Sequence, residues 1–258
     1  MSRASQDGIW QPLHDELDHW TNAGRQIRLW LRDDDAIAPS PALDQLAELG
    51  ERLDLPVLLA VIPMLAQPAL ARALCAMPTL LPCQHGCWHR NHVPEGGKKS
   101  EFGPLRPADQ IHAEIAQARQ RLGDLFGEFL LPVFVPPWNR IDPDHAALLP
   151  ALGFSGLSCF RGYKLVPAGA PQLGNTDLDI MDWSSRTGRQ PQDLIAEAGR
   201  LLAAKRTSPA PDGDAFGVLM HHRDHDATAW GFLDAFLARV IGHPEVLPTD
   251  PRSLFRIG

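Results

Sequence analysis

Short apolar segments alternate with segments of helical periodicity along most of the chain, and this alternation limits the possible folds more than any other feature. Seven segments have the length and composition of strands: 27–32, 56–62, 80–83, 131–135, 154–160, 178–183 and 215–221. Helical spacing of apolar residues separates most of them, over 41–54, 66–76, 108–126, 144–152, 191–204 and 226–241. Repeated strand–helix units predict an α/β fold with a parallel sheet and outer helices, and seven or eight units can close into a barrel.

Composition narrows the class of protein. No linker or low-complexity segment divides the 258 residues, so we expect a single domain over 1–258. The net charge of −7 leaves no basic surplus, which argues against nucleic acid or an anionic membrane as a partner. No apolar run reaches the ~18 residues of a membrane helix or has the pattern of a signal peptide. We therefore expect a cytoplasmic protein whose four cysteines are reduced.

Polar clusters follow four of the strand candidates. In parallel α/β folds the carboxyl ends of strands meet at one mouth, so we expect these clusters to converge. They are Asp33-Asp34-Asp35, His85 with His89, the segment 136–140, and His221-His222. Three successive aspartates repel one another unless water or a cation neutralises them. Two histidines and a carboxylate are a typical set of ligands for a divalent metal, although a lone His-x-x-x-His pair and a solvated aspartate turn are both common.

Five motifs in order strengthen this interpretation. They are an Asp-Asp pair within 32–35, His-Gly-Cys-Trp-His at 85–89, Val-Pro-Pro-Trp at 135–138, Asp-Ile-Met-Asp-Trp at 179–183 and Leu-Met-His at 219–221. The set resembles the polysaccharide deacetylases of carbohydrate esterase family four and covers most of the chain. The resemblance implies a distorted (β/α)7 barrel of the polysaccharide deacetylase type.

The resemblance also implies roles for individual residues. Asp35, His85 and His89 would bind one divalent metal ion, most simply Zn²⁺. Asp34 would act as the catalytic base and His221 as the catalytic acid. The remaining residues would orient these groups or line the substrate pocket: Trp138, Asn139, Arg140, Asp182 and Trp183. Asp182 in particular would orient His221 or an arginine, and Asp179 is expected to be an ordinary strand-end residue.

The chain departs from the family pattern at several positions. Gly86 stands where the family has a small hydroxyl residue, and Val135 stands where it has an arginine that orients the catalytic carboxylate. Arg140 and Arg32 are the two candidates to replace that arginine. The aspartate pair can be aligned as Asp34-Asp35, which we prefer, or as Asp33-Asp34, and the glycine that usually follows the pair is missing. These changes indicate a divergent branch.

The leading hypothesis is a metal-dependent hydrolase of amide C–N bonds that deacetylates an acetylated amino sugar or oligosaccharide. An amide or imide hydrolase with a non-sugar substrate and a catalytically silent barrel that binds carbohydrate or protein remain as alternatives. His92, His222 and His225 match no family position, and for each we expect a structural role, or a role in supporting a metal ligand, rather than metal ligation itself. The loop 93–103 is either a lid or a plain solvated loop, with Lys98, Lys99 and Glu101 as a solvated face. The oligomeric state is left open.

Overall fold

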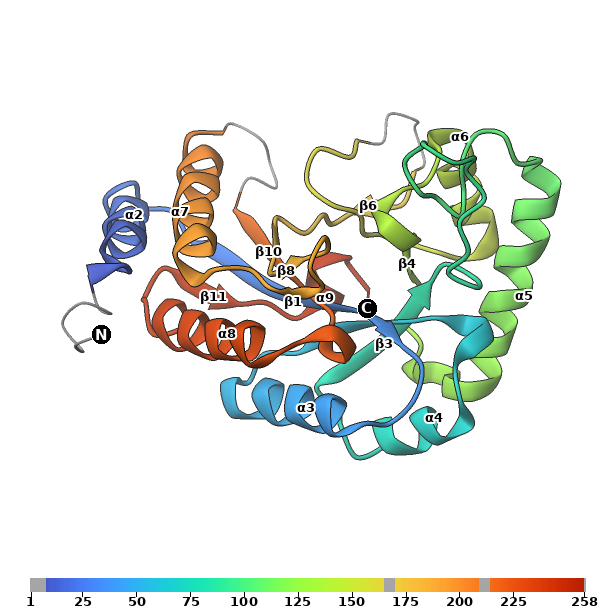
Figure 1. Ribbon diagram of the computed structural model, residues 1–258, viewed down its shortest axis with the longest axis horizontal. Coiled ribbons are helices and arrows are strands. Elements are labelled where there is room, and N and C mark those ends of the chain that lie inside the picture. Colours follow the sequence, from blue (N-terminus) through green and yellow to red (C-terminus); the bar gives the residue numbers. More distant parts are fainter. Residues whose placement is uncertain (1–7, 165–169, 209–213, 258) are drawn as a thin grey trace.

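A curled parallel sheet forms the centre of the computed structural model, which describes residues 8–164, 170–208 and 214–257 (Figure 1). Eight strands follow one another in the order β6-β5-β4-β3-β2-β1-β10-β7, and every pair is parallel. Their bounds are β1 Ile27–Ala36, β2 Val57–Val61, β3 Leu80–His85, β4 Val133–Val135, β5 Gly156–Leu157, β6 Gln172–Leu173, β7 Leu178–Asp179 and β10 Ala215–Met220. A ninth strand, β11 (Val246–Pro248), pairs with the start of β1. The predicted distorted (β/α)7 barrel is confirmed.

A single stretch of chain bridges the two ends of this sheet. β6 pairs with β5 and β7 pairs with β10, and only four residues separate β6 from β7. Thr176 N donates to Cys159 O at 3.0 Å, and Asp177 N donates to Gly217 O at 2.7 Å. The stretch therefore leaves the β5 side and joins the β10 side, so that seven segments of parallel chain encircle the interior.

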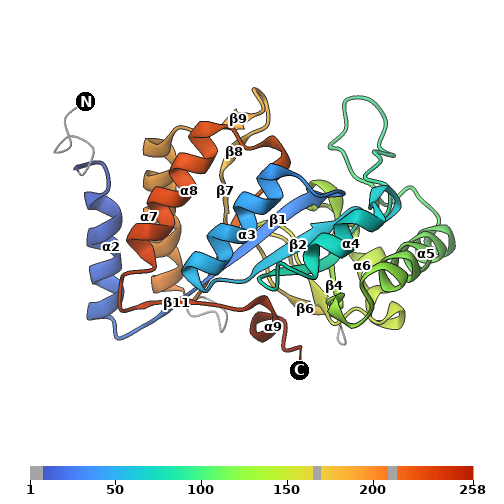
Figure 2. The ribbon, with the colours of Figure 1, turned by 90° about the horizontal axis from the view of Figure 1, so that it is seen from below.

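Helices cover the outside of the sheet (Figures 1 and 2). Their bounds are α2 Gln11–Asn22, α3 Pro41–Leu53, α4 Pro68–Leu74, α5 Ala108–Phe126, α6 Pro143–Ala146, α7 Pro191–Thr207, α8 Ala227–Val240 and α9 Pro251–Leu254. Short 3₁₀ turns lie at Pro63–Leu65, Gly127–Phe129, Pro137–Asn139, Leu149–Leu152 and His222–Asp224. None of the helices in the described residues is long and apolar enough to cross a membrane.

Alternation along β1 separates two faces of the sheet. Leu29 and Leu31 belong to the large core shared with the outer helices, whereas Trp30 belongs to an inner cluster with Phe255. Trp30 and Phe255 meet edge to face with ring centroids 6.0 Å apart, so the chain end after α9 fills the bottom of the barrel. The next two residues on the inner face are Arg32 and Asp34, because side chains two apart share a face of a strand. The interior is thus apolar at the bottom and charged at the top.

Most of the predicted elements are present, and several differ from the prediction. The expected strand 178–183 divides: β7 joins the barrel, while β8 (Met181–Asp182) forms a separate hairpin with β9 (Thr187–Gly188). The expected helix 144–152 becomes α6 followed by a 3₁₀ turn, because Pro150 interrupts it. Helix α2 was not predicted, although Leu13, Leu17 and Trp20 have helical spacing and are completely buried.

Candidate metal centre and catalytic site

The three consecutive aspartates at the end of β1 face three different partners because the strand bulges there. Asp33 aligns with Leu59 of β2 and Ala36 aligns with Val61, so β1 has one extra residue over this stretch. Asp35 lies in the bulge with a φ of 72°, a left-handed conformation that few residues other than glycine adopt. Bulges re-aim side chains and are frequent beside active sites. The bulge thus lets Asp35 point elsewhere than a regular strand would allow.

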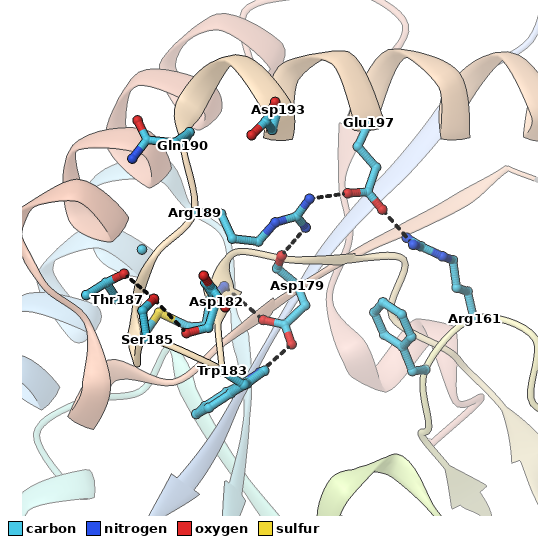
Figure 3. A pocket seen from close by; sticks show the side chains of 13 residues that line it. Arg161, Asp179, Asp182, Trp183, Ser185, Thr187, Arg189, Gln190, Asp193 and Glu197 are labelled. Carbon is cyan, nitrogen blue, oxygen red and sulfur yellow. Dashed lines mark hydrogen bonds and ion pairs between the residues drawn. The ribbon is translucent and has the colours of Figure 1, made fainter.

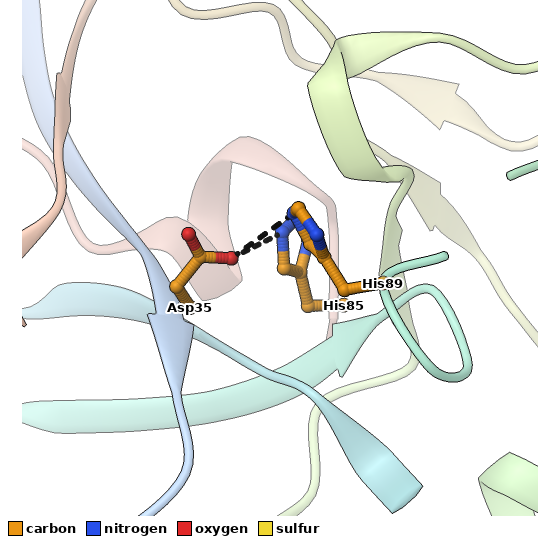
Figure 4. Close-up of side chains that lie close together, drawn as sticks. All are labelled: Asp35, His85 and His89. Carbon is orange, nitrogen blue, oxygen red and sulfur yellow. Dashed lines mark ion pairs between the residues drawn. The ribbon is translucent and has the colours of Figure 1, made fainter. Parts of the chain in front are cut away.

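Asp35 meets His85 and His89 at the mouth of the barrel (Figure 4). Its Oδ1 lies 3.1 Å from Nε2 of His85 and 3.3 Å from Nε2 of His89. The ligand atoms of the three residues all lie within 4.8 Å of one another, and no other such group of three or more potential ligands occurs in the described residues. Nδ1 of His85 lies 3.0 Å from the carbonyl oxygen of Val135. Donation to that carbonyl leaves the lone pair of Nε2 directed at the site.

The electrostatics of these residues suit a cation. Burial alone would raise the pKa of Asp35, but the hydrogen bond and charge of His85, together with the charge of His89, hold it well below its ordinary value. Burial would lower the pKa of His85, and the carboxylates of Asp34 and Asp35 raise it overall. Burial and the neighbouring His85 lower the pKa of His89. The donor set of one carboxylate and two imidazoles therefore fits a divalent metal ion.

Arg32 holds Asp34 in place. Its Nε and Nη2 lie 2.9 Å and 3.0 Å from the two carboxylate oxygens of Asp34, and the side chains are 0% and 3% exposed. The guanidinium also donates to Oγ of Ser158 at 2.7 Å and to Oδ1 of Asn139 at 2.5 Å. A planar guanidinium in such a bidentate pair fixes both the position and the rotation of the carboxylate. Of the two candidates for the missing arginine, Arg32 is thus the one that meets Asp34.

Arg140 contacts the loop 93–103. Its Nη1 donates to the carbonyl of Lys99 at 3.0 Å, and Oγ of Ser100 donates to the carbonyl of Arg140 at 3.2 Å. The residue therefore clamps the base of the loop 93–103 onto the segment after β4. The structure does not bring its guanidinium to the aspartates.

Trp138 and Asn139 adopt left-handed backbone conformations in succession, with φ of 55° and 57°. Two such residues in a row are costly and persist only where the surroundings hold them. Here the amide of Asn139 is held by Arg32, and the Trp138 ring lies 4.4 Å from the ring of His89, centroid to centroid. The strained turn thereby places an aromatic wall beside the candidate metal ligands.

His221 follows β10 on the other side of Asp34. Nε2 of His225 accepts a hydrogen bond from the backbone N–H of His221 at 3.2 Å. Burial lowers the pKa of His225 to about 4, so this acceptor is neutral at physiological pH. The next residue, His222, pairs with Asp33: Nδ1 lies 2.5 Å from Oδ1, and its backbone N–H donates to Oδ2 at 2.8 Å. These contacts fix the backbone on both sides of His221 and give His222 and His225 the structural roles that were expected.

The ring of Trp183 meets that of His221 edge to face, with centroids 4.4 Å apart. Nε1 of Trp183 donates to Asp179 at 2.8 Å (Figure 3). Burial raises the pKa of Asp179 overall, although the nearby His221 acts to lower it. Asp182 accepts from the backbone N–H and the hydroxyl of Ser184 in its own turn. The carboxylate that shares an environment with His221 is thus Asp179, whereas Asp182 caps a turn.

Asp179 and Trp183 also line a polar cavity of about 670 Å³ beside the barrel mouth (Figure 3). Glu197 of α7 lies across it and pairs with Arg161 and Arg189 at 2.6 Å and 2.5 Å. Trp183, whose ring contacts His221, forms part of the wall of this cavity.

Glu101 corrects one prediction. It was expected on a solvated face with Lys98 and Lys99, but its side chain is completely buried. Its carboxylate accepts hydrogen bonds from the backbone N–H groups of Cys87 and Trp88 at 3.1 Å and 2.8 Å. These hydrogen bonds hold the end of the polar loop 93–103 against the segment that carries the candidate metal ligands. The local sequence does not reveal this contact.

Several solved structures with this architecture are described as polysaccharide deacetylases or family 4 carbohydrate esterases. A protein from Mycobacterium smegmatis described as a polysaccharide deacetylase aligns over 90% of both chains with a TM-score of 0.67 and 14% identity. A family 4 carbohydrate esterase from Streptomyces lividans in complex with acetate aligns over 86% of this chain and 92% of its own, with a TM-score of 0.55 and 17% identity. No protein-family profile matches the sequence, and no curated protein does.

A third similar structure is a family 4 pseudoenzyme from Bacillus anthracis, with a TM-score of 0.56 and 13% identity over 86% of this chain and 63% of its own. The chain therefore has the fold of the family 4 carbohydrate esterases in a divergent form. Because active and inactive proteins share this fold, activity has to be argued from the site.

Proposed function

We propose that the chain is a metal-dependent hydrolase of amide C–N bonds that removes acetyl groups from an acetylated amino sugar or oligosaccharide. The observation that carries the proposal is the convergence of Asp35, His85 and His89 beside a carboxylate, Asp34, that a buried arginine holds in place. We also propose that residues 1–258 form one catalytic domain. The four cysteines are free, and on this basis we propose the reducing cytoplasm as its location.

Asp35, His85 and His89 would hold the metal ion. When bound, a divalent cation such as Zn²⁺ lowers the pKa of a coordinated water and polarises the substrate carbonyl. Asp34 would accept the proton of the attacking water as the water adds to the amide carbon. Its carboxylate is prepared for this role because the bidentate pair with Arg32 prevents it from rotating away.

The negative charge that develops on the carbonyl oxygen needs a donor. In the segment 136–139 the two prolines have no N–H, and the N–H of Asn139 donates to the carbonyl of Pro136 at 2.9 Å. The backbone N–H of Trp138 makes no hydrogen bond within the described residues and is the candidate donor. The left-handed conformation of Trp138 sets the direction of this group.

His221 would give a proton to the departing amine, which is a poor leaving group when unprotonated. Its Nδ1 is buried and has no hydrogen-bond partner in the described residues. Trp183 contacts the ring edge to face, and its indole N–H in turn donates to Asp179. Trp138 and Trp183 would form opposite walls for the sugar ring, since exposed indole rings are suited to stacking on apolar ring faces.

Acetate release from N-acetylated chitooligosaccharides tests the proposal. We expect zinc-dependent release by the wild type and its loss in D34N and H221A, with D44N on the exposed face of α3 as the matched control. Turnover only on amides or imides without a sugar would contradict the proposed sugar substrate but would support the proposed hydrolase activity. A chain that takes up metal and binds oligosaccharide without turnover would be the silent barrel.

A further inference from the structure

The segment that carries His89 depends on an unusual backbone path. It turns through left-handed conformations at Gly86, with φ of 55°, and at His89, with φ of 58°. The backbone N–H groups between these turns point to one side, where they meet the carboxylate of Glu101. Cys87 N lies 3.1 Å from Oε2 and Trp88 N lies 2.8 Å from Oε1, with Arg90 N at 3.5 Å from the same oxygen.

Glu101 is a buried anion that backbone N–H groups neutralise. Its side chain is completely buried, and no lysine, arginine or histidine of the described residues lies within ion-pair distance of its carboxylate. The nearby Arg106 donates to the backbone carbonyl of Glu101 at 3.2 Å and forms its ion pair with Glu114 at 2.6 Å. A buried carboxylate is costly unless several donors satisfy it. The N–H groups of Cys87 and Trp88 must therefore stay where they are for the charge to remain buried.

Gly86 leaves the space for this carboxylate. A Cβ atom at position 86 would lie 2.3 Å from Oε2 of Glu101 and 2.5 Å from Cδ of Pro137. A side chain at 86 and the carboxylate at 101 thus exclude each other. Pro137 belongs to the turn that presents Trp138, so the carboxylate lies between the two segments that surround the candidate metal site.

We propose that Glu101 is a positioning residue that shapes the segment 86–89 so that His89 reaches the metal, with Gly86 as its obligatory counterpart. The inference rests on the proposed function, since it assigns the metal to His89. It also gives the loop 93–103 a role that is distinct from a lid, because Glu101 near the end of this loop supplies the carboxylate that binds the segment 86–89. Groups that orient metal ligands without touching the metal affect affinity by about 10-fold to 100-fold.

Zinc affinity measured by competition with a chromophoric chelator tests the proposal. In E101Q the amide NH₂ faces a backbone N–H in place of an acceptor, so we expect about 10-fold weaker binding, and E101A should lose up to about 100-fold. E95Q, an exposed residue of the same loop, is the matched control and should bind as the wild type does. A purely structural role would lower the thermal stability of the metal-free chain and leave the affinity of the folded chain unchanged, which would overturn the proposal.

A reciprocal pair of variants tests the role of Gly86. We expect G86S to weaken zinc binding strongly in the wild-type background, where serine collides with both the carboxylate and Pro137, and less in the E101A background, where only the collision with Pro137 is left. The collision with Pro137 and the strain of a positive φ at serine are present in both backgrounds and cancel in the comparison. Equal effects in the two backgrounds would contradict the coupling. A wild-type chain that binds no zinc would refute the proposed function as well, whereas zinc binding that is insensitive to E101Q refutes this inference alone.

Discussion

Replacement of Arg32 by methionine removes the cation that pairs with Asp34 within the described part of the chain and leaves the carboxylate buried. The variant loses both bonds of the bidentate pair and the bonds to Ser158 and Asn139. Removal of one partner from a buried ion pair costs about 3–5 kcal/mol, because the remaining charge has no compensation. In a chain of this size each kcal/mol lowers Tm by about 2–4 °C, so R32M should melt about 6–20 °C below the wild type.

The matched control is R28M. Arg28 lies on the same strand and also forms a bidentate pair, with Asp214 at 2.9 Å for both contacts, but the two side chains are 30% and 33% exposed. Partly exposed pairs of this kind contribute about 0–1 kcal/mol. Differential scanning calorimetry should therefore give a shift for R28M that is several times smaller than the shift for R32M.

A double variant separates the ion pair from general packing. D34N alone leaves the guanidinium without its anion, whereas R32M/D34N leaves no uncompensated charge. We expect the double variant to be less destabilised than the sum of the single variants by about 2 kcal/mol or more. Additivity within about 0.5 kcal/mol would refute the reasoning that Arg32 is present to hold Asp34.

Two further tests address the pairing of Asp33 and the packing inside the barrel. Burial would raise the pKa of Asp33, but the charge and hydrogen bond of His222 lower it overall, so the carboxylate stabilises the fold above the ordinary aspartate pKa and loses this effect as pH falls. D33N should lower Tm strongly at pH 7, and the difference from the wild type should shrink below about pH 4; a constant difference would contradict the ion pair. A Cβ atom at Gly217 would lie 2.7 Å from the ring of Trp30, so G217A should lose about 1–3 kcal/mol in urea unfolding. G231A in α8, which has free space, should gain about 0.5–1 kcal/mol, and equal effects of the two substitutions would contradict the inner packing.

The barrel, and the grouping of His85 and His89 at its mouth, could be predicted because their signals are local. Apolar runs such as 56–62 indicate strands buried on both faces, and His85 and His89 follow such a run at a spacing that can place both rings on one side. Arg32 could be named as one of two candidates because it stands beside the aspartates in the sequence. The choice over Arg140 depends on Ser158 and Asn139, which lie more than one hundred residues away.

Other features depend on contacts that no local pattern contains. Glu101 has the sequence environment of a solvated loop, and only the folded chain shows that its carboxylate accepts from the backbone of Cys87 and Trp88. The bulge at Asp35 likewise depends on how β1 pairs with β2. Because the three neighbouring side chains are identical, the sequence alone could not decide which two of them match the Asp-Asp pair of the family. In the structure Asp33 faces His222 and Asp35 faces the histidines, in agreement with the Asp34-Asp35 alignment.

The central claim is that one cation binds between Asp35, His85 and His89. Anomalous scattering at the zinc absorption edge, from crystals grown with Zn²⁺, tests it most directly, with H92A crystals as a control for the exposed histidine nearby. We predict one strong peak per chain within bonding distance of the Asp35 carboxylate and the two Nε2 atoms, in the wild type and in H92A. A map without a peak at this place, or with zinc only on surface histidines, would contradict the account.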